Sequence, residues 1–350
     1  MVMLNKKYLF FWHGFPVCGL LLSDFINSYP NVHLIIYNPN IDIHKYINNI
    51  NEKVTIIKSP NQIWNLRKKF QNYDYIFHTG WNFYGWLLFD IYSKIKFKSK
   101  IILISDNNLR FSIKQILGKV YFKIFLKKIF NAYFTPGQSG FDLLKFLGAS
   151  PDKIFMGNYG AYSKIYNRLN EKKNRKNEFL FVGQFINRKG LVNLIKAFEI
   201  YKKLNGKWNL RIIGNGPLQY YINLKINKNL IVENFLNPET IAKRMKSAKV
   251  FVLPSNLEHW GTVVCEAAAC GMTLLLSDQV GSKKDLLRTG INGFCFDSQD
   301  INSIVSLFKL IEKINNSWFD HSSVISSKLA SSFDENSFKK ALEILILRIS

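Results

Sequence analysis

The stretch SNLEHWGTVVCEAAACG, residues 255–271, decides the fold. An apolar run at residues 250–253 precedes it and predicts a buried parallel strand. Pro254 ends this strand because it has no N–H to donate to a neighbouring strand. A helix is expected to begin near Thr262, whose hydroxyl can act as an N-cap, and to end at Gly271. The stretch is therefore typical of a strand–loop–helix unit in an α/β fold.

Two acidic residues lie in this unit. Glu258 is expected in the loop at the carboxyl end of the strand, and Glu266 one turn into the helix. The first turn of a helix presents free N–H groups and the positive end of the dipole, which favour a phosphate. Two carboxylates beside an anion site suit a ligand with hydroxyls on both sides of a diphosphate. A nucleotide-sugar has this layout, with ribose on one side and a hexose on the other.

Apolar strands alternate with helical segments along the whole chain, as a parallel α/β sheet requires. In the first half we expect strands at residues 8–12, 33–37, 54–58, 75–78, 101–105 and 132–136. In the second half we expect strands at residues 179–182, 210–213, 230–232, 250–253 and 274–276. With 350 residues, the chain is long enough for two domains that each bury a core.

Polar and glycine-rich segments follow several of these strands. Gly183 and Lys189 come between the strand at residues 179–182 and a helix at residues 191–201. The strand at residues 210–213 ends in Gly-Asn-Gly, where glycine lets the backbone approach a ligand closely. In the first half, His13, His78 and Asp106 stand at the ends of expected strands. Ligands bind beyond the carboxyl ends of such strands, so each set is expected at one edge of its sheet.

These motifs resemble those of retaining family 4 glycosyltransferases, which carry an E-x7-E motif. The shared pattern is Pro-Ser, a short loop, Glu, two residues, Gly, four residues and Glu-Ala-x-Ala-x-Gly. The resemblance implies the GT-B fold, an α/β architecture of two Rossmann-like domains that face each other across a donor and acceptor cleft. It also implies that Glu258 contacts the donor sugar and that Glu266 contacts the ribose hydroxyls.

The resemblance extends the donor site to further residues. Lys189 matches a family lysine that contacts the donor phosphates. Gln184 replaces the arginine of the family pattern, which removes one bidentate phosphate contact, and Arg188 is a candidate to compensate. The nucleotide base is expected to stack at residues 233–236, which include Phe235. The other donor-binding candidates lie in the glycine turns and at the start of the helix: Gly183, Gly214, Gly216, Gly261, Thr262 and Val263.

Asp106 and His78 are the catalytic candidates on the acceptor side, where either could orient the acceptor hydroxyl or relay its proton. The alternative for His78 is a structural histidine, hydrogen-bonded at the end of its strand. We find no acidic cluster typical of a metal site. Family 4 enzymes usually need no divalent metal, so we expect no cofactor besides the nucleotide-sugar co-substrate.

The sequence divides at a polar stretch. Residues 1–168 are predicted to form an N-terminal Rossmann-like acceptor domain, followed by a linker at residues 169–177. Residues 178–334 are predicted to form the C-terminal Rossmann-like domain that binds the donor. The amphipathic helix at residues 335–350 is expected to pack back on the first domain.

The charge admits several partners. The formal net charge is +24, which suits nucleic acid, an anionic membrane surface or anionic substrates. Nucleic acid is disfavoured because Lys is abundant where a nucleic-acid binder would concentrate Arg, and no nucleic-acid module is present. Residues 111–130 form an apolar helical stretch with many lysines. A helix at a membrane surface and a helix packed on the domain with a solvated lysine face both fit, and we prefer the second because the stretch lies between two strands.

The remaining features indicate a cytoplasmic protein, with the inner face of the cell membrane as the alternative location. The four cysteines are scattered, which suits a reducing compartment. The apolar run near the N-terminus is too short for a signal peptide and is interpreted as the first strand. No apolar run is long enough to span a bilayer.

The predicted function is transfer of a sugar, with retention, to a glycan or lipid-linked acceptor in cell-surface polysaccharide biosynthesis. A nicotinamide oxidoreductase is excluded because Gly14 and Gly19 do not supply the glycine pattern that it needs after the first strand. A GT-B-like protein that binds sugar nucleotides without catalysis stays open because of Gln184.

Overall fold

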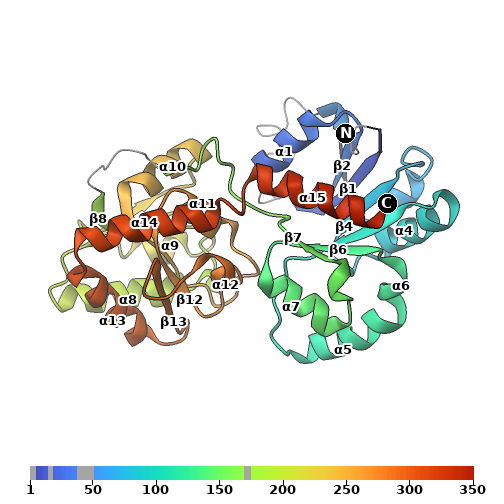
Figure 1. Ribbon diagram of the computed structural model, residues 1–350. Coiled ribbons are helices and arrows are strands. Elements are labelled where there is room, and N and C mark those ends of the chain that lie inside the picture. The colour runs from blue at the N-terminus through green and yellow to red at the C-terminus, as the bar shows by residue number, and fades with distance from the viewer. Residues whose placement is uncertain (1–4, 15–18, 38–50, 169–174) are drawn as a thin grey trace. The chain divides into compact units, whose positions relative to one another are not determined.

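The computed structural model describes residues 5–14, 19–37, 51–168 and 175–350. The chain divides into two compact units (Figure 1). Unit 1 consists of Met1–Gly160 and Asp334–Ser350, and unit 2 consists of Ala161–Phe333. Each unit is built on one parallel sheet, as the alternation of strands and helices predicts. The loop expected at residues 14–19 and the linker expected at residues 169–177 lie partly outside the described residues.

The sheet of unit 1 has the strand order β3-β2-β1-β4-β5-β6-β7, with every neighbouring pair parallel. Its strands are β1 (Tyr8–His13), β2 (Val32–Tyr37), β3 (Val54–Ile57), β4 (Tyr75–Thr79), β5 (Lys100–Ile104), β6 (Ala132–Thr135) and β7 (Ile154–Met156). Its helices include α1 (Gly19–Ser28), α3 (Gln62–Asn65), α4 (Tyr84–Phe97), α5 (Ile113–Tyr121), the π-helical η2 (Phe122–Leu126), α6 (Lys127–Ile129), α7 (Gln138–Leu147) and α15 (Glu335–Ile349). The strands expected in this half are therefore all present.

Alternating side chains of β1 show how this sheet builds its two cores. Leu9 and Phe11 face a cluster to which α4, η2 and α7 contribute. Phe10 faces the other side, where it meets Phe25 of α1 at a centroid distance of 5.9 Å. Helix α15 lies on that second face, because Phe338 packs against Phe25 at 5.2 Å. The carboxyl-terminal segment therefore belongs to unit 1.

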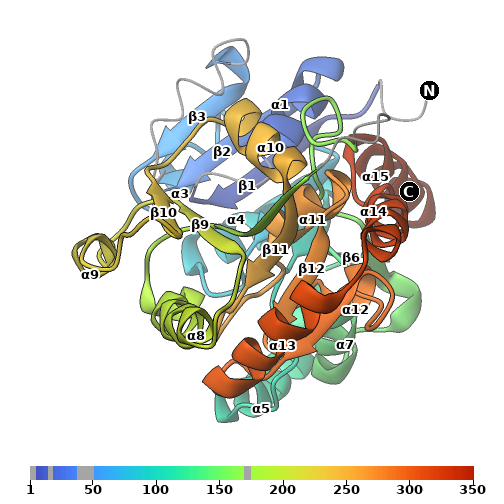
Figure 2. The same cartoon turned by 90° about the vertical axis from the view of Figure 1, so that its left-hand side faces the viewer.

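The sheet of unit 2 has the order β10-β9-β8-β11-β12-β13 and is also parallel. Its strands are β8 (Lys176–Val182), β9 (Asn209–Ile213), β10 (Leu230–Glu233), β11 (Ala248–Leu253), β12 (Thr273–Ser277) and β13 (Gly293–Phe296). Its helices include η4 (Asn187–Lys189), α8 (Leu191–Lys203), α9 (Gln219–Asn223), α10 (Pro238–Ser247), α11 (Thr262–Ala269), α12 (Lys283–Leu286), α13 (Ile301–Lys313) and α14 (Asn316–Ala330). Helices α8 and α13 pack together on one face of the sheet, and α10, α11 and α14 lie on the other (Figure 2).

The boundary between the units falls after Gly160, whereas the sequence placed it after Arg168. The difference has a physical cause, since residues 161–168 are held by unit 2. Lys246 Nζ donates to the Ile165 carbonyl at 3.1 Å, and Arg168 Nε donates to Ser323 Oγ at 3.1 Å. Among the described residues, no helix is both long and apolar enough to cross a bilayer.

Candidate functional site

The carboxyl edge of the unit 2 sheet gathers most of the residues singled out in the sequence. Strands β8, β9, β10 and β11 run parallel, so the loops that follow them leave the sheet at the same edge. The chain order reverses between the neighbouring strands β8 and β11. Ligands in open parallel sheets bind at such a switch point, and this one lies between the loop that carries Lys189 and the loop that carries Glu258.

The loop after β11 is tied to the loop after β12. Glu258 N donates to the Gln279 carbonyl at 3.3 Å, and Gly281 N donates to the Glu258 carbonyl at 3.2 Å. Helix α11 then begins at Thr262, but its N-cap is Gly261, with φ +85° and no side-chain cap. The prediction that Thr262 caps the helix is therefore wrong, because the left-handed turn at Gly261 makes Thr262 the first helical residue.

The Glu258 carboxylate is nearly buried, with 7% of the residue exposed. Lys189 Nζ donates to Oε2, and Ser255 Oγ donates to the same oxygen at 3.1 Å. Arg188 Nη1 lies 3.5 Å from Oε1. Burial alone would raise the pKa of Glu258, but Lys189, Arg188 and the Ser255 hydroxyl hold that pKa below its usual range. Glu258 is therefore ionised at neutral pH.

Lys189 reaches Glu258 because Gly190 brings two backbones into contact. Gly190 has φ +71°, and a Cβ added to it would lie 1.9 Å from the Pro254 carbonyl oxygen. Only glycine fits this combination of a left-handed turn and a close approach. The contact continues in the next residues, where Asn256 N donates to the Arg188 carbonyl at 2.9 Å. The loops after β8 and β11 thus form one surface.

Gln184 and Arg188 lie differently relative to the Lys189–Glu258 ion pair. Gln184, which stands where the family pattern has arginine, is exposed. The Arg188 guanidinium instead lies at the centre, where its Nη1 donates to the Leu257 carbonyl at 2.7 Å and approaches the Glu258 carboxylate. Arg188 is therefore the arginine that the structure brings to Glu258.

Glycines join the loops after β8 and β9 in the same way. A Cβ added to Gly214 would lie 1.9 Å from the Gly183 carbonyl oxygen, and one added to Gly216 would lie 2.7 Å from the Phe185 carbonyl oxygen. Phe185 N also donates to the Asn215 carbonyl at 2.7 Å. The structure therefore brings the glycine turns after β8 and β9 together. At Gly183, Gly214 and Gly216 the backbone carries no side chain.

Glu266 lies one turn into α11 and is half-buried. Within the described part of the chain, no hydrogen bond or ion pair engages its carboxylate. Desolvation by burial raises the pKa of Glu266 to about 7. Near it, Thr262 is buried and Val263 half-buried in the first turn, whose N–H groups have no partner within the helix. Within the described residues, an ionisable acceptor without a partner therefore lies one turn from the N-terminus of α11.

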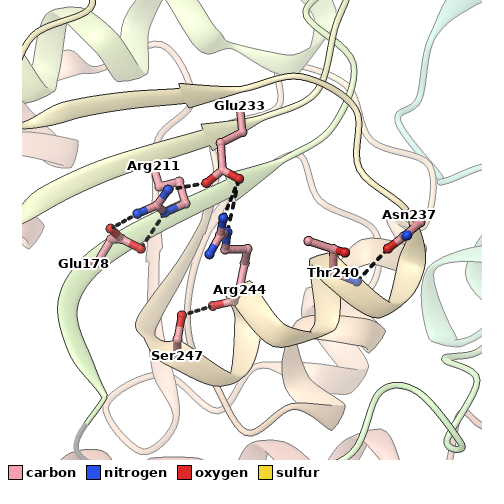
Figure 3. Close-up of polar contacts among 7 residues, drawn as sticks. All are labelled: Glu178, Arg211, Glu233, Asn237, Thr240, Arg244 and Ser247. Carbon is pink, nitrogen blue, oxygen red and sulfur yellow. Dashed lines mark hydrogen bonds and ion pairs between the residues drawn. The ribbon is translucent and has the colours of Figure 1, made fainter.

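Sequence reasoning missed the ion-pair network beneath the loop after β10 (Figure 3). Arg211 binds Glu178 through two hydrogen bonds of 3.0 and 3.1 Å, and it also donates to Glu233. Arg244 Nη2 donates to Glu233 Oε2 at 2.9 Å. Phe235, two residues beyond Glu233, is 54% exposed. The sequence signal was weak, since Arg211 lies on an expected strand and Glu178 and Glu233 lie one residue outside two others, and no strand order was predicted.

The candidates in unit 1 are arranged differently from the expectation. His78 is fully buried, and its Nδ1 lies 2.6 Å from Asp90 Oδ2 of α4. Its ring packs among Phe11, Trp86 and Phe130. This geometry corresponds to the structural histidine of the alternative interpretation, because alternation along β4 directs His78 into the core.

Asp106 follows β5 and is half-buried, and His13 ends β1, which β4 separates from β5, and is exposed. They lie at the carboxyl edge of the unit 1 sheet, since β1, β4 and β5 are parallel neighbours. The role of Asp106 stays a prediction.

The fold and part of the sequence resemble known proteins. The solved structure of Anabaena HepE in complex with UDP and glucose matches with a TM-score of 0.77 and 14% identity, over 97% of this chain and 99% of that chain. This chain has the GT-B fold. Residues 164–336, nearly all of unit 2, match the family described as "Glycosyl transferases group 1".

Two curated relatives are similar to this chain over segments of 131 and 134 residues. An uncharacterized glycosyltransferase of Methanocaldococcus jannaschii is 33% identical over 131 residues, which cover 36% of this chain and 33% of that protein. The lipopolysaccharide 1,6-galactosyltransferase of Salmonella typhimurium is 24% identical over 134 residues, which cover 36% of this chain and 37% of that protein. The chain therefore matches about a third of the length of these relatives.

Proposed function

We propose that this GT-B protein is a glycosyltransferase that uses a nucleotide-diphosphate sugar. The observation that carries the proposal is the Lys189–Glu258 ion pair at the switch point of the unit 2 sheet, in the loop that leads into α11, with Glu266 one turn into that helix. A cation, an ionised carboxylate and an unengaged carboxylate around a helix N-terminus match the phosphate and hydroxyl groups of such a donor. The match of unit 2 to the glycosyl transferases group 1 family supports the same conclusion.

The donor is oriented by several groups in this proposal. Its diphosphate meets the first N–H groups of α11, at Gly261, Thr262 and Val263. Glu266 accepts the ribose hydroxyls, and the exposed ring of Phe235 stacks on the base. Gly183, Gly214 and Gly216 let the backbone of their turns approach the ligand closely, because no side chain intervenes.

The proposed reaction retains the anomeric configuration. The bond between the anomeric carbon and the diphosphate oxygen breaks, and the acceptor oxygen bonds to that carbon on the same face. The acceptor proton passes to the leaving phosphate oxygen, so no separate base is required. Lys189, with Arg188, stabilises the negative charge that grows on the diphosphate. Glu258 contacts the donor sugar, Asp106 orients the acceptor hydroxyl, and the proposal involves no divalent metal.

The acceptor in this proposal is a glycan or a lipid-linked saccharide used in cell-surface polysaccharide biosynthesis, and the donor sugar is a hexose. The similarity to a lipopolysaccharide galactosyltransferase supports this part. The reaction would then take place in the cytoplasm, at the inner face of the cell membrane.

One observation favours a second candidate, a protein that binds sugar nucleotides without catalysis. Gln184 stands where the family pattern has a phosphate-binding arginine, and it is exposed without a charge of its own. In that case the site would bind a donor but would not stabilise the leaving diphosphate.

Titration calorimetry with nucleoside diphosphates, beginning with UDP, tests the donor site. We expect binding that weakens by about 1–3 kcal/mol in Glu266→Ala, the usual cost of a lost hydrogen bond to a charged group. Unchanged affinity in Glu266→Ala would show that the ribose assignment is wrong. Release of the diphosphate from nucleotide-sugars in the presence of an acceptor then separates the transferase from the non-catalytic binding protein.

A further inference from the structure

One helical segment of unit 1 carries apolar side chains on its solvent side. It runs from α5 through the π-helical η2 to α6, residues 113–129. No residue of α5 is buried. Its exposed apolar side chains, with the preceding phenylalanine, are Phe111 (67%), Ile113 (76%), Ile116 (51%), Leu117 (67%), Val120 (57%), Tyr121 (41%), Ile124 (50%) and Phe125 (57%). We call this set the α5 apolar face.

The spacing of these residues makes a continuous stripe. Ile113, Leu117, Val120 and Ile124 follow one another at intervals of three or four, so they share one side of the helix. The opposite side is already in use, because Phe122 and Leu126 are fully buried in the unit 1 core. A helix that only packs on its domain would expose polar residues. The expected helix packed on the domain with exposed lysines is therefore present, but its outward side also carries an apolar stripe that the sequence reading did not include.

Positive charge surrounds the α5 apolar face. Lys114, Lys127 and Lys128 are exposed. The sequence has no acidic residue between Asp106 and Asp142, so nothing within this stretch offsets these charges. Lys123 is exposed as well, whereas Lys119 is half-buried and its Nζ sits over the Phe146 ring at 4.3 Å. An apolar stripe bordered by lysines is the pattern of a helix that lies in the interface of an anionic bilayer.

A neighbouring helix of unit 1 also exposes apolar side chains. Lys94 of α4 donates to the carbonyls of Lys128 and Ile129, which places α4 beside α6. Helix α4 also exposes apolar side chains at helical spacing: Tyr84 (74%), Leu88 (57%), Ile91 (37%) and Ile95 (78%). Two adjoining helices of unit 1 thus expose apolar stripes.

We propose that the α5 apolar face inserts into the interfacial region of an anionic membrane, with Lys114, Lys127 and Lys128 at the level of the lipid headgroups. Charge decides between this occupant and a second copy of the chain. Each copy has a formal net charge of +24 and would bring the same lysines to a symmetric contact, where they repel, whereas anionic lipids attract them. The proposal goes beyond the donor chemistry, because no residue of the unit 2 site takes part.

Insertion of the apolar stripe and attraction by charge alone predict different effects of mutation and of salt on membrane binding. If the apolar stripe enters the interface, polar replacements weaken binding even when every lysine is kept. If the positive charge alone holds the protein, the apolar residues do not matter and salt abolishes binding. Variants of the two kinds therefore separate the mechanisms.

The experiment is sedimentation of the full chain with vesicles of phosphatidylcholine, with and without phosphatidylglycerol. One variant combines Ile113→Ser, Leu117→Ser and Val120→Ser, and another combines Lys114→Gln, Lys127→Gln and Lys128→Gln. The control combines Leu224→Ser and Ile226→Ser, which replace apolar side chains of unit 2 that are 66% and 51% exposed. All of these side chains are exposed, and thermal unfolding checks that each variant folds.

We expect binding only to vesicles that contain phosphatidylglycerol. The serine variant should lower the partition constant more than about tenfold, and the glutamine variant about a hundredfold, at roughly fivefold for each lysine. The control should bind like the wild type. Equal binding of the serine variant and the wild type would overturn insertion. So would a wild-type dimer in light scattering that the serine variant converts to a monomer, because a second copy would then cover the face.

The affinity for nucleoside diphosphate, measured without vesicles, keeps the two proposals apart. Unchanged nucleotide affinity in the serine variant together with unchanged vesicle binding would end the membrane proposal and leave the donor site intact. Vesicle binding by a wild-type protein that does not bind nucleotide would support the membrane proposal and contradict the proposed donor site.

Discussion

Lys189 and Glu258 form a nearly buried ion pair that joins the loops after the neighbouring strands β8 and β11. The pair neutralises Lys189 when no anion is present. In the proposed reaction the diphosphate takes over part of this role, and its charge grows as the glycosidic bond breaks. The ammonium is then held in place by Glu258 before the charge develops, which is the condition for efficient electrostatic stabilisation.

Lys189→Ala is expected to lower kcat by about 10²-fold or more, comparable to the loss of one preorganised hydrogen-bond donor. The donor KM should change less, because the interaction strengthens in the transition state. Lys196→Ala is the control, since Lys196 is exposed on α8. Steady-state kinetics with varied donor concentration make the comparison. A near-normal kcat with only a raised donor KM would assign Lys189 to uniform binding of the ground state and the transition state.

Glu258 should contribute stability that acid removes. Its pKa is depressed in the folded protein, so the contribution is fully present above the unfolded value of about 4.3 and is lost as the pH falls through the folded value. Glu258→Gln leaves the buried ammonium of Lys189 unpaired and should lower the free energy of unfolding at pH 7. Urea denaturation at pH 7 and below pH 4 gives the test. A difference between wild type and variant that stays constant over this range would contradict the ion-pair origin.

Glu266 should behave in the opposite sense. Its pKa is raised to about 7, so ionisation costs stability as the pH rises from the unfolded value toward 7, and Glu266→Gln removes that cost. The ribose hydroxyls donate to the ionised form, and nucleotide affinity should therefore rise between pH 6 and pH 8, around the pKa of about 7. Calorimetry at several pH values measures this rise, which should be absent in Glu266→Gln. The same slope in both proteins would point to another titrating group, such as the ligand phosphate.

Gly190 and Gly290 offer a matched pair for the contact between the loops. Both have positive φ, +71° and +81°, but a Cβ on Gly190 meets the Pro254 carbonyl at 1.9 Å, whereas one on Gly290 meets nothing within 4 Å. Alanine at either position costs about 1–2 kcal/mol of backbone strain. Gly190→Ala should cost about 1–3 kcal/mol more because the two loops must separate. Denaturant unfolding of both variants checks this, and equal destabilisation would show that the loops give way freely.

Sequence patterns predicted those elements whose geometry depends on residues close together in the chain. Apolar runs located β8 and β11, and the spacing of Glu258 and Glu266 followed from a loop and one helical turn. Other features depend on which face of a strand or helix points toward the core. His78 points into the core because of its place in the alternation of β4, and the stripe on α5 is exposed because Phe122 and Leu126 occupy the inner side. Neither outcome is encoded in a short stretch of residues.

Arg211 and Arg244 both bind Glu233, but Arg211 is nearly buried and Arg244 is partly exposed. Comparing the two therefore tests whether the ion-pair network positions the loop after β10. Arg211 is nearly buried between strands and also binds Glu178 through two hydrogen bonds, whereas 41% of the Arg244 side chain is exposed. Burial alone would raise the pKa of Glu233, but the hydrogen bonds from Arg244 and Arg211 lower it, so the carboxylate is ionised at neutral pH. A lysine cannot reproduce the forked geometry of arginine.

Arg211→Lys should therefore release the end of β10, where Gly214 N donates to the Glu233 carbonyl at 3.1 Å and Phe235 follows two residues later. We expect weaker nucleotide binding and a loss of about 1–3 kcal/mol in the free energy of unfolding, since lysine keeps the charge but cannot make the paired hydrogen bonds to the buried Glu178 carboxylate together with the bond to Glu233. Arg244→Lys, at the exposed side of the same carboxylate, should change both by less than about 1 kcal/mol. Calorimetry and urea unfolding of the two variants decide the matter, and equal effects would mean that the network does not position the segment proposed to hold the base.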